Sequence, residues 1–230
     1  MKTLIKKIID LTGYSIVKNE RSRNKAFHVT NAIEHNSMKR ADDFYSDKKL
    51  VTKFISKERL GLFTEIIAFS QKCNVALERA KIADFGCGTG HFLGMISEKF
   101  QNKNLTGFEF SQEAIKCARE FFPSLEFSTQ NLYENIDTEM FDVSFCLEVL
   151  EHLENPENAL RNIINATKAN GTLILTVPNG RIDSFEGHIN FWGPEGWELF
   201  CRKQISNAKF NFGSLADNQF LIAVIELNKQ

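Results

Sequence analysis

The chain has 230 residues, of which 43% are hydrophobic and 25% are charged, with 28 Lys and Arg side chains against 29 Asp and Glu. These values are typical of one soluble globular domain that folds without a disulfide or metal staple. The net charge of −1 argues against a protein held on nucleic acid mainly by a phosphate-neutralising surface, so we expect no nucleic-acid partner.

The N-terminal segment differs in charge from the remainder. Residues 1–25 carry seven basic and two acidic side chains. Apolar residues recur at helical spacing over Leu4–Leu11, with lysines opposite, until Gly13 ends the pattern. Such a helix can pack on its own domain or a partner, which we favour, or make peripheral contact with an anionic membrane. No stretch reaches the roughly 20 apolar residues of a membrane span, so we expect no stable membrane insertion.

Cysteine usage indicates the compartment. The five cysteines form no C-x-x-C pair, and an odd count indicates reduced thiols. Their spacing supports no structural zinc site, and we predict no metal ligands. Because no apolar run of signal-peptide length opens the chain, we expect a cytoplasmic protein.

Two regions follow one another along the chain. Residues 19–48 are polar and lack a clean period, whereas helical periodicity returns from Leu50 to about Leu77. We therefore expect a helical N-terminal segment over residues 1–75 and a second domain over residues 76–230.

In the second domain, predicted strands alternate with predicted helices. Strands are expected at residues 81–85, 105–110, 125–128, 141–146 and 172–177, and helices at 91–100, from 114 to 121, and from Asn155-Pro156 to Asn170-Gly171. A helix from Pro194 to Ile205 and two strands at 209–212 and 220–227 complete the order. This order predicts a doubly wound α/β sheet with an antiparallel edge.

The segment Asp84-Phe-Gly86-Cys-Gly88-Thr-Gly90 follows a strand and opens a helix. Glycines let the backbone approach a ligand, and a helix N-terminus offers unpaired N–H groups. The spacing is G-x-G-x-G rather than the G-x-G-x-x-G of dinucleotide loops. An acid two residues before the first glycine would repel a pyrophosphate and suits a ligand that bears an ammonium group.

Glu109 ends the second strand, 25 residues after Asp84. This offset is close to the roughly 20 residues at which an acid accepts the ribose hydroxyls of a bound nucleoside. A carboxylate can accept two O–H donors at once, so we expect Glu109 to fix a sugar.

These residues resemble the class I S-adenosylmethionine-dependent methyltransferases. The glycine loop is similar to their first motif, and residues 105–111 to the strand with their ribose acid. Phe141-Asp-Val-Ser-Phe-Cys-Leu-Glu-Val-Leu-Glu-His152-Leu is similar to a segment of the small-molecule branch, as are residues 169–179 and 187–195. The resemblance covers roughly residues 75–230. It implies a Rossmann-like, seven-stranded, mostly parallel sheet with an antiparallel last strand, and S-adenosylmethionine as cofactor.

The same resemblance implies a set of cofactor-binding residues. They are Asp84, Gly86, Cys87, Gly88, Gly90, Glu109, Phe110, Asn131, Leu132 and Cys146. One departure is that Gln130-Asn131 stands where the family often has an Asp near the adenine amine. An Asn carbonyl can still accept from that amine. Leu132 equally suits the core.

The candidate acceptor side rests on fewer signals. His152 and His188 follow the fourth and fifth strands, and either can act as a general base. Alternatively, His152 packs beneath its loop or orients the cofactor, and His188 binds substrate. Tyr45 and Trp192 are candidate substrate contacts, although an aromatic residue near a helix start also suits the core. We expect the helical segment over residues 1–75 to cover the acceptor site.

The resemblance therefore implies methyl transfer to a small molecule, with a hydroxyl oxygen preferred over nitrogen or carbon. The opening residues 6–17 resemble those of bacterial methyltransferases associated with cell-surface glycan assembly, so a sugar hydroxyl is one expected acceptor. One alternative is a protein that binds the cofactor without turnover, as a sensor or partner subunit. Another is an NAD-dependent oxidoreductase, which the loop spacing disfavours.

Overall fold

The computed structural model describes residues 36–137 and 140–228. The basic helix predicted over Leu4–Leu11 lies outside these residues. The strands are β1 (Ile82–Phe85), β2 (Leu105–Glu109), β3 (Glu126–Thr129), β4 (Phe141–Leu147), β5 (Thr167–Pro178), β6 (Ala208–Leu215) and β7 (Phe220–Leu227). The helices are α3 (Met38–Ser46), α4 (Lys48–Phe54), α5 (Lys57–Lys72), α6 (His91–Phe100), α7 (Gln112–Phe121), the short 3-10 helix η1 (Leu150–His152), α8 (Pro156–Ala166) and α9 (Pro194–Gln204).

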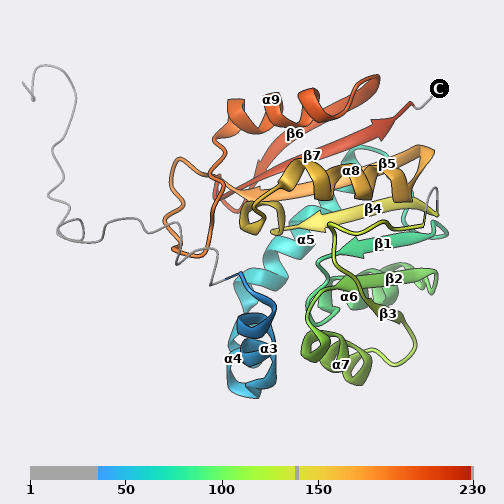
Figure 1. Ribbon diagram of the computed structural model, residues 1–230. Helices are drawn as coiled ribbons and strands as arrows, with labels where there is room; N and C mark the ends of the chain where they lie inside the picture. Colours follow the sequence, from blue (N-terminus) through green and yellow to red (C-terminus); the bar gives the residue numbers. More distant parts are fainter. Residues whose placement is uncertain (1–35, 138–139, 229–230) are drawn as a thin grey trace, which may run out of the picture.

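The strands form one sheet in the order β3-β2-β1-β4-β5-β7-β6 (Figure 1). Neighbouring strands from β3 to β5 are parallel, whereas β7 pairs antiparallel with both β5 and β6. The predicted Rossmann-like, seven-stranded sheet with an antiparallel last strand is thus confirmed. The expected antiparallel edge is also confirmed, because the edge strand β6 pairs antiparallel with β7, which is inserted between β5 and β6.

Helices cover both faces of this sheet. Alternate strand residues point to opposite faces, so Ile222 and Val224 of β7 join one apolar core while Leu221 and Ala223 join the other. The first core is completed by helices α5, α6 and α7, and the second by α8 and α9. Because the central strands are covered on both faces, their sequences are nearly continuous apolar runs.

One helix lies where the sequence shows no clean period, and one predicted helix boundary was wrong. Helix α3 lies within the segment 19–48, and its N-terminus is capped by the Ser37 side chain, which accepts from the Arg40 amide. None of its residues is fully buried, and the apolar residues Ala41, Phe44 and Tyr45 face the cavity rather than the core. Helix α8 ends at Ala166 rather than at Asn170-Gly171, and β5 begins at Thr167. A Cβ at Gly171 would lie 2.9 Å from the carbonyl oxygen of Asp142, so this glycine permits close strand pairing rather than capping a helix.

In the part of the chain that the structure describes, no helix combines the length and apolar character needed to cross a bilayer.

Candidate active site

A cavity of about 1340 Å³ lies at the C-terminal ends of the parallel strands. Its walls come from the segments that follow β1 to β5 and from helices α3, α4 and α5. Ligands of open α/β sheets bind at this end, where the strand order reverses between β1 and β4. Pockets for one small ligand measure about 300–1,000 Å³, so this cavity has room for two ligands side by side.

The glycine loop forms one wall of the cavity. Gly86 and Gly88 line it, and a Cβ at Gly88 would lie 3.1 Å from the hydroxyl oxygen of Tyr45. Gly90 is the N-cap of α6 with φ +77°, and a Cβ there would lie 2.6 Å from the ring of Phe127. Gly90 is not among the residues that line the cavity. Its glycine identity therefore serves the packing of α6 on the sheet rather than ligand approach.

Glu109 is held in a fixed position by the backbone around it. Its Oε2 accepts from the Gly88 amide at 3.0 Å, and its Oε1 accepts from the amides of Phe110 and Ser111 at 2.8 and 3.2 Å. Burial raises the pKa of Glu109, while these three N–H groups oppose that rise. A carboxylate has about four acceptor positions, so capacity for a ligand hydroxyl remains.

Asp84, at the end of β1, is a buried carboxylate with an unsatisfied oxygen. It is 2% exposed and lines the cavity, and its Oδ1 has no hydrogen-bond partner among the described residues. Burial, together with the charge of Glu109, raises its pKa to about 8. An unpaired buried carboxylate is costly, and a cationic group of a ligand would compensate for that cost.

The remaining predicted cofactor residues divide into two groups. Phe110, Asn131, Leu132 and Cys87 line the cavity. The Asn131 side-chain oxygen accepts from a backbone amide two residues later and keeps a second lone pair. Leu132 lines the cavity and also packs in the core, so both of the alternatives stated for this residue apply. Cys146 is fully buried in the core and does not line the cavity.

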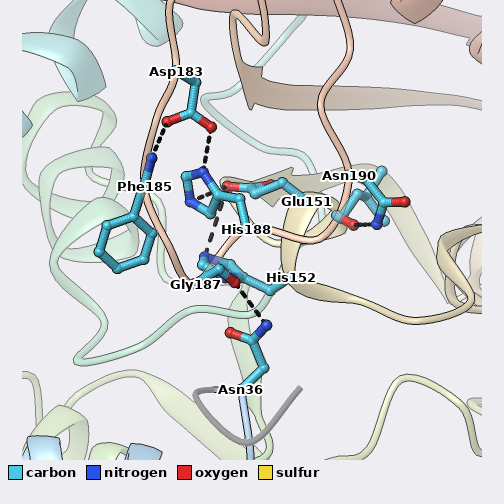
Figure 2. Close-up of polar contacts among 9 residues, drawn as sticks. Asn36, Glu151, His152, Asp183, Phe185, Gly187, His188 and Asn190 are labelled. Atoms are coloured by element: carbon cyan, nitrogen blue, oxygen red, sulfur yellow. Dashed lines mark hydrogen bonds and ion pairs between the residues drawn. The ribbon is translucent and has the colours of Figure 1, made fainter. Parts of the chain in front are cut away.

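The two candidate histidines lie together, as Figure 2 shows, with ring centroids 4.6 Å apart. His188 Nδ1 is 2.5 Å from Asp183 Oδ2, and His152 Nδ1 is 3.2 Å from the carbonyl oxygen of Gly187. The Nε2 atoms of both rings are 3.9 Å from the same oxygen, Oε1 of Glu151. Two segments far apart in the sequence thus bring two imidazoles and a carboxylate to one point.

A second buried carboxylate and one arginine adjoin this cluster. Glu148 has φ +57°, an uncommon value for a residue other than glycine, and its Oε1 is buried without a partner among the described residues. Burial raises the pKa of Glu148 to about 8, and the positive charge of Arg59 opposes the rise. Arg59 belongs to α5 and lines the cavity. The N-terminal helices therefore contribute a cation to the site.

Sequence reasoning missed four residues of this region: Arg59, Glu148, Glu151 and Asp183. Glu148, Glu151 and His152 offered a usable signal, because they lie within one stretch of five residues. Arg59 and Asp183 carry no such signal, since each meets its partners only through the tertiary fold.

The two candidate substrate residues have different positions. Tyr45 lines the cavity beside Gly88, and burial, with the charge of Glu109 second, raises the pKa of its hydroxyl. Trp192 does not line the cavity. Its ring packs 5.6 Å from that of Trp197 and 4.9 Å from that of Phe200, which matches the core alternative.

Comparison with known proteins identifies a family that this chain resembles. Residues 83–173 match the family described as a methyltransferase domain. The ubiquinone biosynthesis O-methyltransferase of Idiomarina loihiensis is 28% identical over 130 residues, 50% of this chain and 52% of that protein. The tRNA U34 carboxymethyltransferase of Helicobacter pylori strain P12 is 32% identical over 102 residues, 41% of this chain and 39% of that protein. The matches thus span about half or less of these relatives.

The fold is also shared with a solved structure. A S-adenosylmethionine-dependent methyltransferase from Aquifex aeolicus superposes with a TM-score of 0.61 at 15% sequence identity. The match covers 79% of this chain and 99% of that chain. At this identity the likeness establishes the common sheet architecture.

Proposed function

This chain belongs to the class I S-adenosylmethionine-dependent methyltransferases, and from that premise we propose that it transfers a methyl group to a hydroxyl oxygen of a small molecule. The observation that carries the proposal is one cavity with two differently equipped parts. One part holds Asp84 and Glu109, and the other holds Glu151, His152 and His188. A methyl transfer needs both ligands in such adjoining positions.

In the first part, the side chains fit S-adenosylmethionine. The unpartnered Oδ1 of Asp84 is suited to the ammonium group of its methionine portion, and Glu109 is suited to a ribose hydroxyl. Phe110, Asn131 and Leu132 would then surround the adenine. We assign residues 76–230 to this cofactor domain and residues 1–75 to a helical cover, of which α3 to α5 line the cavity.

In the second part, the side chains suit a hydroxyl acceptor. Bound S-adenosylmethionine supplies an electrophilic methyl group, so the protein has to orient the acceptor oxygen and receive its proton. The acceptor oxygen forms the new bond to the methyl carbon, the sulfur–carbon bond breaks with its electrons on sulfur, and the hydroxyl proton leaves. We assign the removal of this proton to the group formed by Glu151, His152 and His188. The Nε2 atoms of both imidazoles face Oε1 of Glu151.

The acceptor class is a finer part of the proposal. The relative named as an O-methyltransferase supports oxygen as the acceptor atom. The opening residues, which lie outside the described part of the chain, favour a sugar hydroxyl. We therefore propose two acceptor classes to be tested side by side, namely sugars and sugar nucleotides on one hand and phenols on the other. Transfer RNA is the third acceptor class to be tested, because one relative is named as a tRNA carboxymethyltransferase.

The experiment is an acceptor screen by mass spectrometry. The purified full chain is incubated with S-adenosylmethionine and each acceptor class, and both the methylated product and the demethylated cofactor are quantified. The expected result is acceptor-dependent formation of both in equal amounts with a small hydroxyl compound. Tight cofactor binding without product from any class would instead support a silent sensor or partner subunit, and methylation of RNA alone would overturn the small-molecule proposal.

A further inference from the structure

We propose that strand β6 is a dimerisation surface, on which a second copy of this chain adds its own β6 in antiparallel orientation to form one continuous sheet. β6 is the last strand in the sheet order, and in the described part of the chain its only strand partner is β7 (Figure 1). None of residues 206–215 lines the cavity, so this surface is separate from the proposed site of methyl transfer.

The hydrogen bonds to β7 define which backbone groups of β6 face outward. The Asn228 amide donates to the carbonyl oxygen of Asn207 at 3.2 Å. In an antiparallel pair, such hydrogen-bonded positions alternate with positions whose N–H and C=O groups point away from the partner strand. Asn207 therefore bonds β7, and so do the odd-numbered residues that follow it. The outward groups belong to the even-numbered residues Ala208, Phe210, Phe212 and Ser214.

The two edges of the sheet differ in how they are protected. Edge strands are commonly kept from pairing by short length, proline, a bulge or charge. β3 has four residues, and Nη2 of Arg119 donates to the carbonyl oxygen of Phe127 at 2.7 Å. β6 has eight residues, no proline and an uninterrupted register with β7. Its lysine, Lys209, is paired with Glu226 at 2.7 Å. β6 thus lacks the usual features that prevent edge pairing.

The side-chain pattern of β6 is complementary to itself about Asn211. A two-fold axis through Asn211 places Phe210 of each copy opposite Phe212 of the other. The remaining opposed pairs are Lys209 with Gly213 and Ala208 with Ser214. Aromatic pairs directly opposite each other stabilise a sheet, and no like charges face each other in this register. The pattern therefore favours a second copy of the chain as the occupant.

On one face of the sheet, β6 presents an aromatic pair that a second copy would extend. The rings of Phe210 and Phe212 stack with centroids 5.7 Å apart, and the guanidinium of Arg202 lies 4.7 and 5.3 Å from them. Glu198 accepts from Nε of Arg202 at 2.9 Å, so this charge is paired within its own chain. Two such layers would meet at the axis as a row of four rings.

On the other face, helix α5 contacts β6 toward the C-terminal end of the strand. A Cβ at Gly213 would lie 2.5 Å from the ring of Phe69, and Glu65 accepts from the Ala216 amide at 2.8 Å. Antiparallel pairing reverses the second strand. The two copies of α5 would therefore lie against opposite ends of the paired strands rather than against each other.

The first test is the mass of the full-length protein, measured by sedimentation velocity over a range of concentrations. We expect a reversible equilibrium between monomer and dimer. Asn211→Lys places two like charges opposite each other at the axis and should weaken dimerisation about tenfold or more. Asn170→Lys, the same change at an exposed residue of β5, is the matched control and should dimerise as the parent does.

The second test is disulfide cross-linking, which reports the register. In the proposed dimer Asn211 faces its own counterpart at a non-hydrogen-bonded position, where Cα atoms lie about 4.5 Å apart, within the range of a disulfide. Asn211→Cys should therefore give a linked dimer under mild oxidation. Ser214→Cys faces Ala208 and lies roughly 20 Å from its counterpart, so it should not. The parent, with its five cysteines, gives the background.

The outcomes separate this inference from the proposed function. Far-UV circular dichroism and binding of the demethylated cofactor show whether each variant is folded. A parent protein that stays monomeric, or a dimer that folded Asn211→Lys leaves intact, overturns the surface. Equal cross-linking of Asn211→Cys and Ser214→Cys overturns the register and with it the proposed pairing. Loss of the dimer in Asn211→Lys with unchanged cofactor binding supports the surface, whether or not any acceptor is methylated.

Discussion

At the scale of single residues, the cofactor side depends on two buried carboxylates in different states. Glu109 has three backbone amides as partners, whereas Asp84 has an oxygen with none among the described residues. Because a hydrogen bond to a charged group contributes about 1.5–3 kcal/mol, these two side chains should contribute to ligand affinity in separable ways. In the proposed function, Glu109 is expected to position a sugar and Asp84 to select for positive charge.

The first prediction concerns Glu109→Gln. The amide retains the shape but loses one charge and one acceptor, so we expect the affinity for the demethylated cofactor to fall roughly 10- to 100-fold. Isothermal titration calorimetry measures it. Glu113→Gln, in the first turn of α7, makes the same change at a partly exposed residue and should bind normally. Equal affinities for the two variants would remove Glu109 from the ribose site.

The second prediction is the pH dependence of stability caused by Asp84. Burial raises the pKa of this group to about 8 in the folded state, against an ordinary value near 3.8. Between these values the folded state keeps a proton that the unfolded state has lost, so the free energy of unfolding should fall as the pH rises. The slope from this group is at most about 1.4 kcal/mol per pH unit.

Urea unfolding of the ligand-free protein between about pH 5 and 7.5 measures this slope. Asp84→Asn should reduce the slope without abolishing it, because Glu148 also has a pKa raised to about 8 and contributes with the same sign. Asp142→Asn removes a carboxylate whose pKa is lowered, beside Lys168, and should leave the slope in this window unchanged. A slope insensitive to Asp84→Asn would contradict the assignment.

At the scale of elements, the Asp42 side chain of α3 bonds the N-terminus of α7 in the cofactor domain. Asp42 accepts from the Ser111 hydroxyl at 2.6 Å and from the Glu113 amide at 3.4 Å, so a negative charge lies at the N-terminus of α7. Helix dipoles favour this placement. Ser111 is adjacent to Phe110 and also bonds Glu109, so the position of α3 and the geometry of the cofactor side are linked.

The third prediction follows from this link. Asp42→Ala should lower the free energy of unfolding by about 1–2 kcal/mol, through loss of a hydrogen bond and of the helix-terminus charge. It should also weaken cofactor binding. Asp43→Ala changes the neighbouring exposed carboxylate and is the control for both chemical denaturation and calorimetry. If the two variants are equally stable, α3 is not anchored through Asp42.

The elements also show what could be predicted from sequence and why the remainder could not. Residues 82–110 combine a buried strand, a glycine loop and a strand-terminal acid. Each of these features is recognised from neighbouring residues in the sequence, so this part of the site could be predicted. Helix α3 lies in the segment expected to be helical, but its bounds could not be predicted, because residues 19–48 are polar and show no clean period. The pairing of His188 with Asp183, and the approach of Arg59 to Glu148, arise from contacts between distant segments. Periodicity and spacing contain no information about such contacts.

At the scale of the whole molecule, ligand binding should be visible as added thermal stability. A ligand at about 100 times its Kd raises the free energy of unfolding by about 2.7 kcal/mol. For a chain of this size that corresponds to an increase in Tm of roughly 5–10 °C.

The fourth prediction is therefore a Tm increase of this order with S-adenosylmethionine or its demethylated product, measured by calorimetry. NAD at the same concentration is the control, because the acid before the glycine loop opposes a pyrophosphate. A larger increase with NAD would reverse the choice between the methyltransferase and the oxidoreductase.

The packing of Trp192 on Trp197 has an optical consequence. These are the two tryptophans of the chain, and both lie among the residues packed against the second core rather than in the cavity wall. Trp197 is 1% exposed, so its indole emission should be that of an apolar environment and should shift to the red only when α9 leaves the sheet. Two of the three tyrosines, Tyr45 and Tyr133, line the cavity instead. Selective excitation of tryptophan will thus report unfolding, while ligand occupancy is better followed through tyrosine.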